Sequence, residues 1–250
     1  MRSNPRHKKA GFDDVAERRR SPFRATRRAR RAAPSNPGRT ILAIGAFCYP
    51  VAVKLLSRVV LAIFVLAAVF IAFAYMRASS ARDVDRAYHA AIPKTVILQS
   101  ISFSAGGDIP SSYTCKGEGV SPELSWEDAP DKALSYVLIV TDWDGPTPRL
   151  RLGNFTHWIL YNIPQDVREI KSAATPAELA QRKIEIGNNS SNAAVYVPPC
   201  PPLGKHRYIF RLYALDVPQI HPASRDRDAM MDAMTGHVLA YGEIAGLFGG

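Results

Sequence analysis

Two kinds of catalytic motif are missing from the sequence. There is no G-x-S-x-G stretch, which would hold a serine nucleophile on a sharp turn, and no HxH or HExxH pattern, which would place metal ligands side by side. Their absence argues against hydrolysis by a serine nucleophile and against a metal-dependent phosphoesterase. The sequence therefore predicts no catalytic residue, no bound metal and no cofactor.

Cysteine is scarce: the 250 residues contain three. Cys48 falls in an apolar run near the N-terminus, whereas Cys115 and Cys200 lie in the loop-like contexts SYTCKG and PPCPPLG. Neither of the latter two has a recognisable catalytic setting. In an oxidising compartment they could form one disulfide, but spacing does not show that their Cα atoms approach each other, so a bonded and an unbonded pair both remain open.

Carboxylates are scarce in residues 1–40, which contain 13 of the 32 lysines and arginines and only 3 acidic residues. This basic tail has four prolines and few large apolar residues, so it cannot bury enough surface to offset the entropy lost on ordering. We expect it to be disordered and to remain on the cytoplasmic side of a membrane. Nucleic acid is not the expected partner.

The longest uncharged apolar run, VVLAIFVLAAVFIAFAYM at residues 59–76, is just long enough to cross a bilayer. The apolar segment at 41–58 lies directly before this run, too close for a second crossing, and is expected near the interface. Lys and Arg are concentrated before the span, which predicts a cytoplasmic N-terminus and an extracytoplasmic C-terminal domain. A signal peptide cleaved near residues 79–81 is the alternative to this single-pass anchor.

A short polar linker at residues 77–93 is followed by a β-rich region at 94–250. Four runs rich in β-branched and aromatic residues, TVILQSISF, LSYVLIVTD, FTHWILYNIP and HRYIFRLYALD, are separated by turn-forming residues. No periodic helices alternate with them, which argues against a doubly wound parallel sheet. The clearest helix is SRDRDAMMDAMTGH at residues 224–237, with Ser224 as its expected N-cap.

Period-two alternation places two histidines at the ends of apolar stripes. His157 is expected to share a strand face with Ile159 and Tyr161. By the same rule, His206 shares a face with Tyr208. This arrangement suits a pocket at a sheet edge, although each histidine taken alone is more typical of a hydrogen-bonded structural residue.

Three motifs occur in order along the β region: TDWDGP, NFTHWILYNIP and PPCPPLGKHRYIFRLYALD, with YTCKGEGVSPELSW upstream. Together they resemble the phosphatidylethanolamine-binding proteins, and most closely the bacterial YbhB/YbcL branch described as Raf kinase inhibitor-like. The resemblance extends from about residue 95 to about residue 248. It implies an all-β domain in which a large antiparallel sheet packs on a smaller one, with a few peripheral helices, here preceded by one transmembrane helix.

The resemblance also implies a small cavity that binds anions, typically phosphate or a phospholipid head group. The positions that match this pocket are Asp142, Asp144, His157, His206 and Tyr208, with the backbone around Cys200 and Pro201 as a wall. Trp143 stands where the family often has proline, and NNSSNAAVYV replaces a glycine-rich stretch. These departures leave the size of the ligand and its access open.

The pocket chemistry follows from these side chains. Imidazole and phenol groups can donate hydrogen bonds to phosphate oxygens. Asp142 is expected to orient a histidine and favour its imidazolium form, or to meet an ammonium group, while Asp144 braces the turn. The sequence thus predicts a membrane-anchored, non-enzymatic binding module for phosphate-bearing groups, with a possible regulatory role.

Two alternatives remain. Some relatives regulate kinases or proteases by binding them, and the loop with Arg149 and Arg151 is a candidate surface for such a protein partner. The second alternative is a metal-dependent phosphoesterase. The residues that could hold its divalent ion are Asp142, Asp144, His157 and His206.

Overall fold

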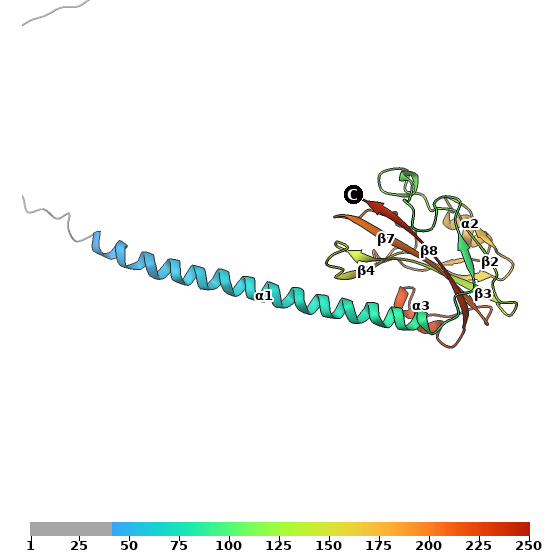
Figure 1. Ribbon diagram of the computed structural model, residues 1–250, viewed down its shortest axis with the longest axis horizontal. Helices are drawn as coiled ribbons and strands as arrows, with labels where there is room; N and C mark the ends of the chain where they lie inside the picture. The colour runs from blue at the N-terminus through green and yellow to red at the C-terminus, as the bar shows by residue number, and fades with distance from the viewer. Residues whose placement is uncertain (1–41) are drawn as a thin grey trace, which may run out of the picture. The chain divides into compact units, whose positions relative to one another are not determined.

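The computed structural model describes residues 42–250, so the tail expected to be disordered lies outside the described part of the chain. Its first element is the helix α1, Leu42–Ala90 (Figure 1). From Val51 onward this helix is long and apolar enough to cross a membrane. Its large apolar side chains are not packed in a core, since Leu66 and Phe70 are 69% and 70% exposed.

The end of α1 occupies most of the segment that the sequence suggested as a linker. Residues 77–90 continue the helix, and the side chain of Asp85 binds two arginines of the β domain. Its carboxylate oxygens lie 2.9 Å from Arg211 Nη1 and 2.6 Å from Arg227 Nη2. Burial alone would raise the pKa of Asp85, but a hydrogen bond from His89 and the charges of the two arginines hold it below its ordinary value.

Eight strands follow α1 within the described residues. They are β1 Ile97–Gln99, β2 Leu124–Glu127, β3 Ser135–Gly145, β4 Gly153–Pro164, β5 Glu169–Ile170, β6 Glu185–Ile186, β7 Lys205–Leu215 and β8 Val238–Gly249. Each of the four runs expected to be extended contains a strand, namely β1, β3, β4 or β7. The long strand β8 was not expected.

Strand β8 contains several glycines, which are uncommon in strands, so it was not recognised from the sequence. Two of these glycines are required by packing. A Cβ on Gly242 would come within 2.5 Å of the Val96 carbonyl oxygen, and one on Gly246 within 2.5 Å of Ile109 Cγ1. The strand therefore lies where neighbouring segments pass too close for a side chain.

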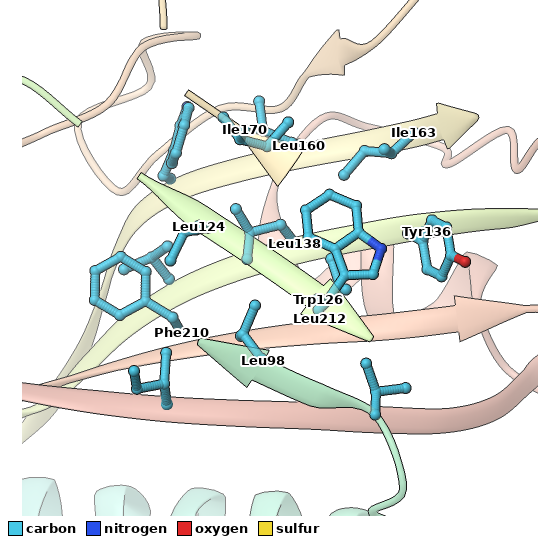
Figure 2. Close-up of a cluster of buried hydrophobic side chains, with 14 of the residues drawn as sticks. Leu98, Leu124, Trp126, Tyr136, Leu138, Leu160, Ile163, Ile170, Phe210 and Leu212 are labelled. Atoms are coloured by element: carbon cyan, nitrogen blue, oxygen red, sulfur yellow. The ribbon is translucent and has the colours of Figure 1, made fainter. Parts of the chain in front are cut away.

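The strands form two antiparallel sheets, as the resemblance implied. The large sheet has the order β6-β4-β3-β7-β8 and the small sheet the order β1-β2-β5. Between them lies a core that includes Leu98 and Trp126 from the small sheet and Leu138 and Phe210 from the large one (Figure 2). Trp126 meets Tyr136 edge-to-face, with ring centroids 5.5 Å apart. The fold class predicted from the sequence is confirmed.

The other face of the large sheet is also covered. Val137 and Ile139 of β3 pack in a second cluster with Met230 and Met234, and Tyr88 of α1 lies against it. Because both faces are buried, β3 has a nearly continuous apolar sequence without visible alternation.

Two short helices and one 3-10 turn complete the domain. They are η2 Ser111–Tyr113, α2 Pro176–Gln181 and α3 Arg227–Ala233. Helix α3 is shorter than expected, and its N-cap is Asp226 rather than Ser224. The Asp226 carboxylate accepts from the Ala229 N–H at 3.0 Å, while the Ser224 hydroxyl donates to the same carboxylate. A carboxylate at the N-cap also interacts favourably with the helix dipole.

Candidate functional site

Strand β7 carries two of the expected pocket residues on its inner face. Tyr208 lies in the core between the sheets with Phe210, and His206 precedes it by two residues on the same side. The two residues are 1% and 0% exposed. Arg207, between them, is exposed on the opposite face. The alternation expected for this strand is therefore present.

A β-bulge changes the alternation in β4. Val140 of β3 is paired with Trp158, but the next residue, Thr141, is paired with Thr156. His157 is thus an extra residue without a partner across the ladder. Such a bulge re-aims the side chain that it carries.

The bulge separates His157 from the residues with which it was expected to share a face. Ile159 and Tyr161 pack in the outer cluster beneath α3, whereas the His157 ring meets Tyr208 edge-to-face, with centroids 5.1 Å apart. Phe155 covers the imidazole from its own strand at 4.7 Å. The expected face was wrong, yet the real one brings His157 to Tyr208.

Asp142, near the end of β3, holds His206 in place. Its Oδ2 lies 2.7 Å from His206 Nδ1, and its Oδ1 accepts from the Asp144 N–H at 2.7 Å. The other ring nitrogen of His206 lies 3.2 Å from the Leu203 carbonyl oxygen. Contacts at both ring nitrogens fix the orientation of the His206 imidazole.

Asp144 is engaged with the loop after β3. Its Oδ2 accepts from the Arg207 backbone N–H at 2.9 Å, and its Oδ1 lies 3.0 Å from Arg151 Nε. These are the contacts of a bracing residue. They also tie down Arg151, one of the two exposed arginines considered for a protein partner.

Trp143 does not cover the histidines. The Arg227 guanidinium lies over its ring, 5.3 Å from the centroid. Trp143 therefore packs against Arg227 of α3.

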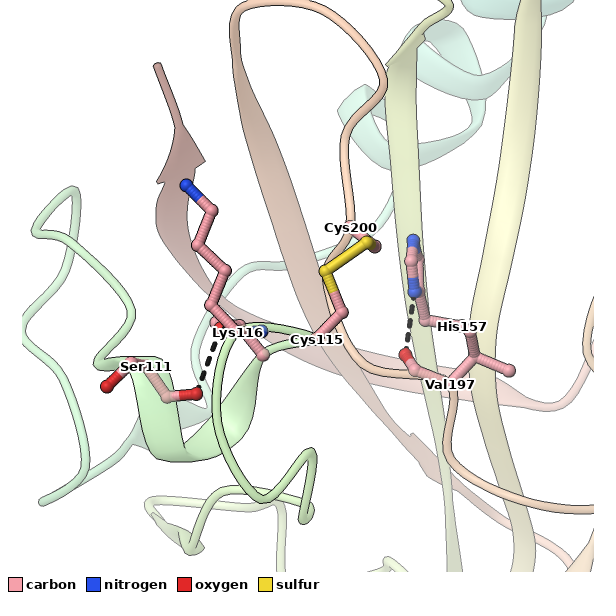
Figure 3. Close-up of a disulfide and its surroundings, with 7 residues drawn as sticks. Ser111, Cys115, Lys116, His157, Val197 and Cys200 are labelled. Atoms are coloured by element: carbon pink, nitrogen blue, oxygen red, sulfur yellow. Dashed lines mark hydrogen bonds between the residues drawn. A yellow bond between two sulfur atoms is a disulfide. The ribbon is translucent and has the colours of Figure 1, made fainter. Parts of the chain in front are cut away.

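Two buried polar atoms at the centre of the site have no protein partner among the described residues. His157 Nδ1 lies 2.8 Å from the Val197 carbonyl oxygen (Figure 3), so this nitrogen carries the proton, and the opposite nitrogen, Nε2, is unpaired. The Tyr208 hydroxyl is unpaired as well. Buried polar groups are nearly always hydrogen-bonded. Of the six buried side-chain atoms that lack a partner among the described residues, these two belong to rings that meet each other.

The surroundings keep both groups neutral. Burial lowers the pKa of His157 below its ordinary value, although the bond to Val197 and the charge of Asp142 act in the opposite direction. Burial, with a smaller contribution from Asp142, raises the pKa of Tyr208 far above its ordinary value. At neutral pH the phenol can donate a hydrogen bond and the imidazole Nε2 can accept one.

A disulfide fixes the loop that forms one wall of the site. Cys115 and Cys200 are bonded, with their Cα atoms 5.4 Å apart (Figure 3). Cys115 N–H also donates to the Pro199 carbonyl at 3.1 Å. Pro201 lies against the end of β8, where a Cβ on Gly249 would come within 2.6 Å of Pro201 Cγ. The wall is therefore held from two directions.

The arrangement is better suited to binding than to metal chemistry. In the part of the chain that the structure describes, no group of three or more His, Cys, Asp or Glu residues is placed to hold a metal ion. Asp142 is occupied by His206, and Asp144 by Arg151. The backbone oxygens of Val197 and Leu203, which orient the two imidazoles, could not be found from the sequence because every residue has such an oxygen.

Comparison with known families matches residues 99–249 to the family described as "Phosphatidylethanolamine-binding protein". A UPF0098 protein from Methanothermobacter thermautotrophicus is 41% identical over 152 residues, covering 60% of this chain and 97% of the relative. A UPF0098 protein from Chlamydia trachomatis is 41% identical over 151 residues, with the same two coverages.

Solved structures agree with this match. A phosphatidylethanolamine-binding protein homolog from Chlamydia trachomatis has a TM-score of 0.56 at 37% identity, covering 63% of this chain and 99% of that one. Escherichia coli YbcL, described as a member of the mammalian PEBP family, has a TM-score of 0.54 at 25% identity and covers 62% and 98%. The chain belongs to the phosphatidylethanolamine-binding protein family, and α1 precedes the matched region.

Proposed function

We propose that the domain is a non-enzymatic binding module whose pocket takes a phosphate-bearing group, such as a phospholipid head group. The observation that carries this proposal is the pair of unpaired buried atoms, His157 Nε2 and Tyr208 OH. Leaving either unsatisfied costs about 1–3 kcal/mol, which a ligand would recover by bonding to both. Family membership supports a binding role in general.

A phosphate group has the atoms that this pair requires. Tyr208 OH donates to an unprotonated phosphate oxygen, while His157 Nε2 accepts from a protonated one or, as imidazolium, donates to another. Asp142 would otherwise repel an anion, but its carboxylate is engaged by the His206 ring, whose Nδ1 lies 2.7 Å from Oδ2. Unlike the arrangement expected from the sequence, His206 thus supports the pocket while His157 and Tyr208 contact the ligand.

We further propose that α1 anchors the module in a membrane as a single uncleaved span, with the N-terminus cytoplasmic. The apolar length of the helix, the excess of Lys and Arg before it and the disulfide of the domain all fit this orientation.

Calorimetric titration of the full chain in detergent with phosphoethanolamine and with inorganic phosphate tests the pocket. Tyr208→Phe removes one ligand contact and should weaken binding about tenfold. Tyr196→Phe is the matched control, because its hydroxyl bonds the Tyr113 carbonyl and should not affect the ligand. Equal affinity in wild type and Tyr208→Phe, or binding that requires added divalent metal, would contradict the proposal.

A further inference from the structure

We propose a second anion-binding site, distinct from the pocket of His157 and Tyr208, in a cavity of about 380 Å³ between the end of α1 and the outer face of the large sheet. It is our inference that this site takes the phosphate of a membrane phospholipid. This part of the inference rests on the membrane anchoring proposed above. The cavity depends on α1, which lies outside the region matched to the family.

Arginine dominates the lining of this cavity. Its charged side chains are five arginines and three carboxylates: Arg82, Arg86, Arg151, Arg207, Arg211, Asp85, Asp144 and Glu243. The excess of positive charge lies in a concave site, where an anion is attracted more strongly than by the same charges on a flat surface.

The carboxylates are already committed to other partners. Asp85 binds Arg211 and Arg227, and Glu243 binds Arg211 at 2.7 Å. Asp144 is paired with Arg151 at 3.0 Å. Asp85 thus joins α1 to the β domain, while Glu243 and Asp144 pair with arginines of the β domain itself.

Three arginines remain without a buried carboxylate. Arg82 donates to the Arg151 carbonyl oxygen, and Arg86 has only the exposed Asp83 at 3.3 Å. The Arg207 guanidinium makes no ion pair to any of the described residues and is exposed. Guanidinium groups that converge on a cavity in this way match the oxygens of a phosphate.

The two sites lie on opposite faces of one sheet. On β7, His206 and Tyr208 point into the core between the sheets, whereas Arg207 and Arg211 point toward α1. Each site can therefore be removed by substitution without touching the other.

The position of the cavity along α1 favours a lipid as the source of the phosphate. Arg82 follows the end of the proposed span by six residues, or about 9 Å of helix. The head-group layer extends roughly 5–8 Å beyond the hydrocarbon core, so the side chain of Arg82 reaches it. A head group in this layer would meet Arg82, and Arg207 lines the same cavity.

The test uses the full chain with Tyr208→Phe as background, so that binding at the first pocket is weakened about tenfold. The protein is placed in phosphatidylcholine nanodiscs that either contain or lack phosphatidylglycerol. Native mass spectrometry then measures how much phosphatidylglycerol the protein retains. Titration with inorganic phosphate in neutral detergent forms the second arm. Arg82→Gln and Arg207→Gln should each weaken lipid retention about fivefold. The exposed Arg149→Gln, outside the cavity, should leave it unchanged.

Several outcomes overturn the inference. Equal losses in the Arg149→Gln control and the cavity variants would indicate unspecific attraction to an anionic bilayer. If none of the substitutions changes the retention of phosphatidylglycerol, the cavity is excluded as its binding site. Binding of inorganic phosphate without retention of lipid would refute the lipid source. None of these results concerns the first pocket, which is tested separately through Tyr208 in the otherwise unchanged chain.

Discussion

Tyr208 and His157 are the residues on which the account depends, because each has a buried polar atom without a protein partner. A group selected for folding alone would be paired or apolar, since an unsatisfied buried hydroxyl is costly. This cost is explained if a bound ligand supplies the missing hydrogen-bond partner.

Tyr208→Phe should therefore not destabilise the free protein and should raise its free energy of unfolding by up to about 1 kcal/mol, because it removes an unpaired hydroxyl from the core. Tyr196→Phe should lower it by about 1 kcal/mol, since this hydroxyl donates to the Tyr113 carbonyl. Urea denaturation of the full chain in detergent measures both. Marked destabilisation by Tyr208→Phe would mean that the hydroxyl has a structural partner.

His157 should make stability depend on pH. Its pKa in the folded protein lies below the ordinary value of about 6.5 that it has when unfolded. Above that pH the ring is neutral in both states and stability is complete. As pH falls, the unfolded ring binds a proton that the folded ring does not, and stability declines by at most about 1.4 kcal/mol per pH unit until the folded pKa is reached.

Urea midpoints measured from neutral to mildly acidic pH check this, with His157→Gln as the comparison. The variant should lack the part of the decline that His157 causes. Parallel curves for the two proteins would show that His157 is not the group responsible.

The residues of the site were easier to predict from the sequence than the faces of the strands to which their side chains point. Alternation placed His206 and Tyr208 correctly, but the bulge that re-aims His157 depends on pairing with β3 and has no local signal in FTHWILYNI. The partners of the two imidazoles are backbone oxygens, which also leave no trace in the sequence.

At the scale of elements, turns and strongly β-forming runs were predictable, whereas segments defined by tertiary contacts were not. Strand β8 contains glycines that make sense only against Val96 and Ile109. Residues 77–90 look like a polar linker because their charged side chains are the ones that bind the domain.

Asp85 should be essential for docking the end of α1. Asp85→Asn removes the charge between Arg211 and Arg227 and should destabilise the joint by about 3 kcal/mol, the scale of breaking a largely buried ion pair. Hydrogen exchange of amides 79–90 should then become faster. Asp83→Asn, at a side chain that is 63% exposed, is the control and should have no effect. Unchanged exchange in Asp85→Asn would show that other contacts hold the helix.

At the scale of the whole molecule, the chain combines a family domain at residues 99–249 with an apolar helix and a basic N-terminal segment. The resemblance predicted the domain and its two sheets from three motifs. The helix was predicted from apolar length alone, which does not distinguish an anchor from a signal peptide.

An uncleaved anchor predicts that the mature protein keeps its N-terminus and stays with membranes after alkaline carbonate extraction. Intact-mass measurement of the extracted protein checks both points, and protease added to the cytoplasmic side should remove only the N-terminal segment. A mature chain beginning near residue 80 would establish cleavage. Digestion of the β domain by protease on the cytoplasmic side would show that the orientation is the opposite of the one proposed.

An experimental structure of the full chain with phosphoethanolamine would locate the ligand on the domain. We predict a phosphate oxygen within about 3 Å of Tyr208 OH and another within the same distance of His157 Nε2, with the Asp142–His206 pair intact. A ligand bound elsewhere on the domain, with these two atoms still unpaired or bonded to protein groups, would contradict it.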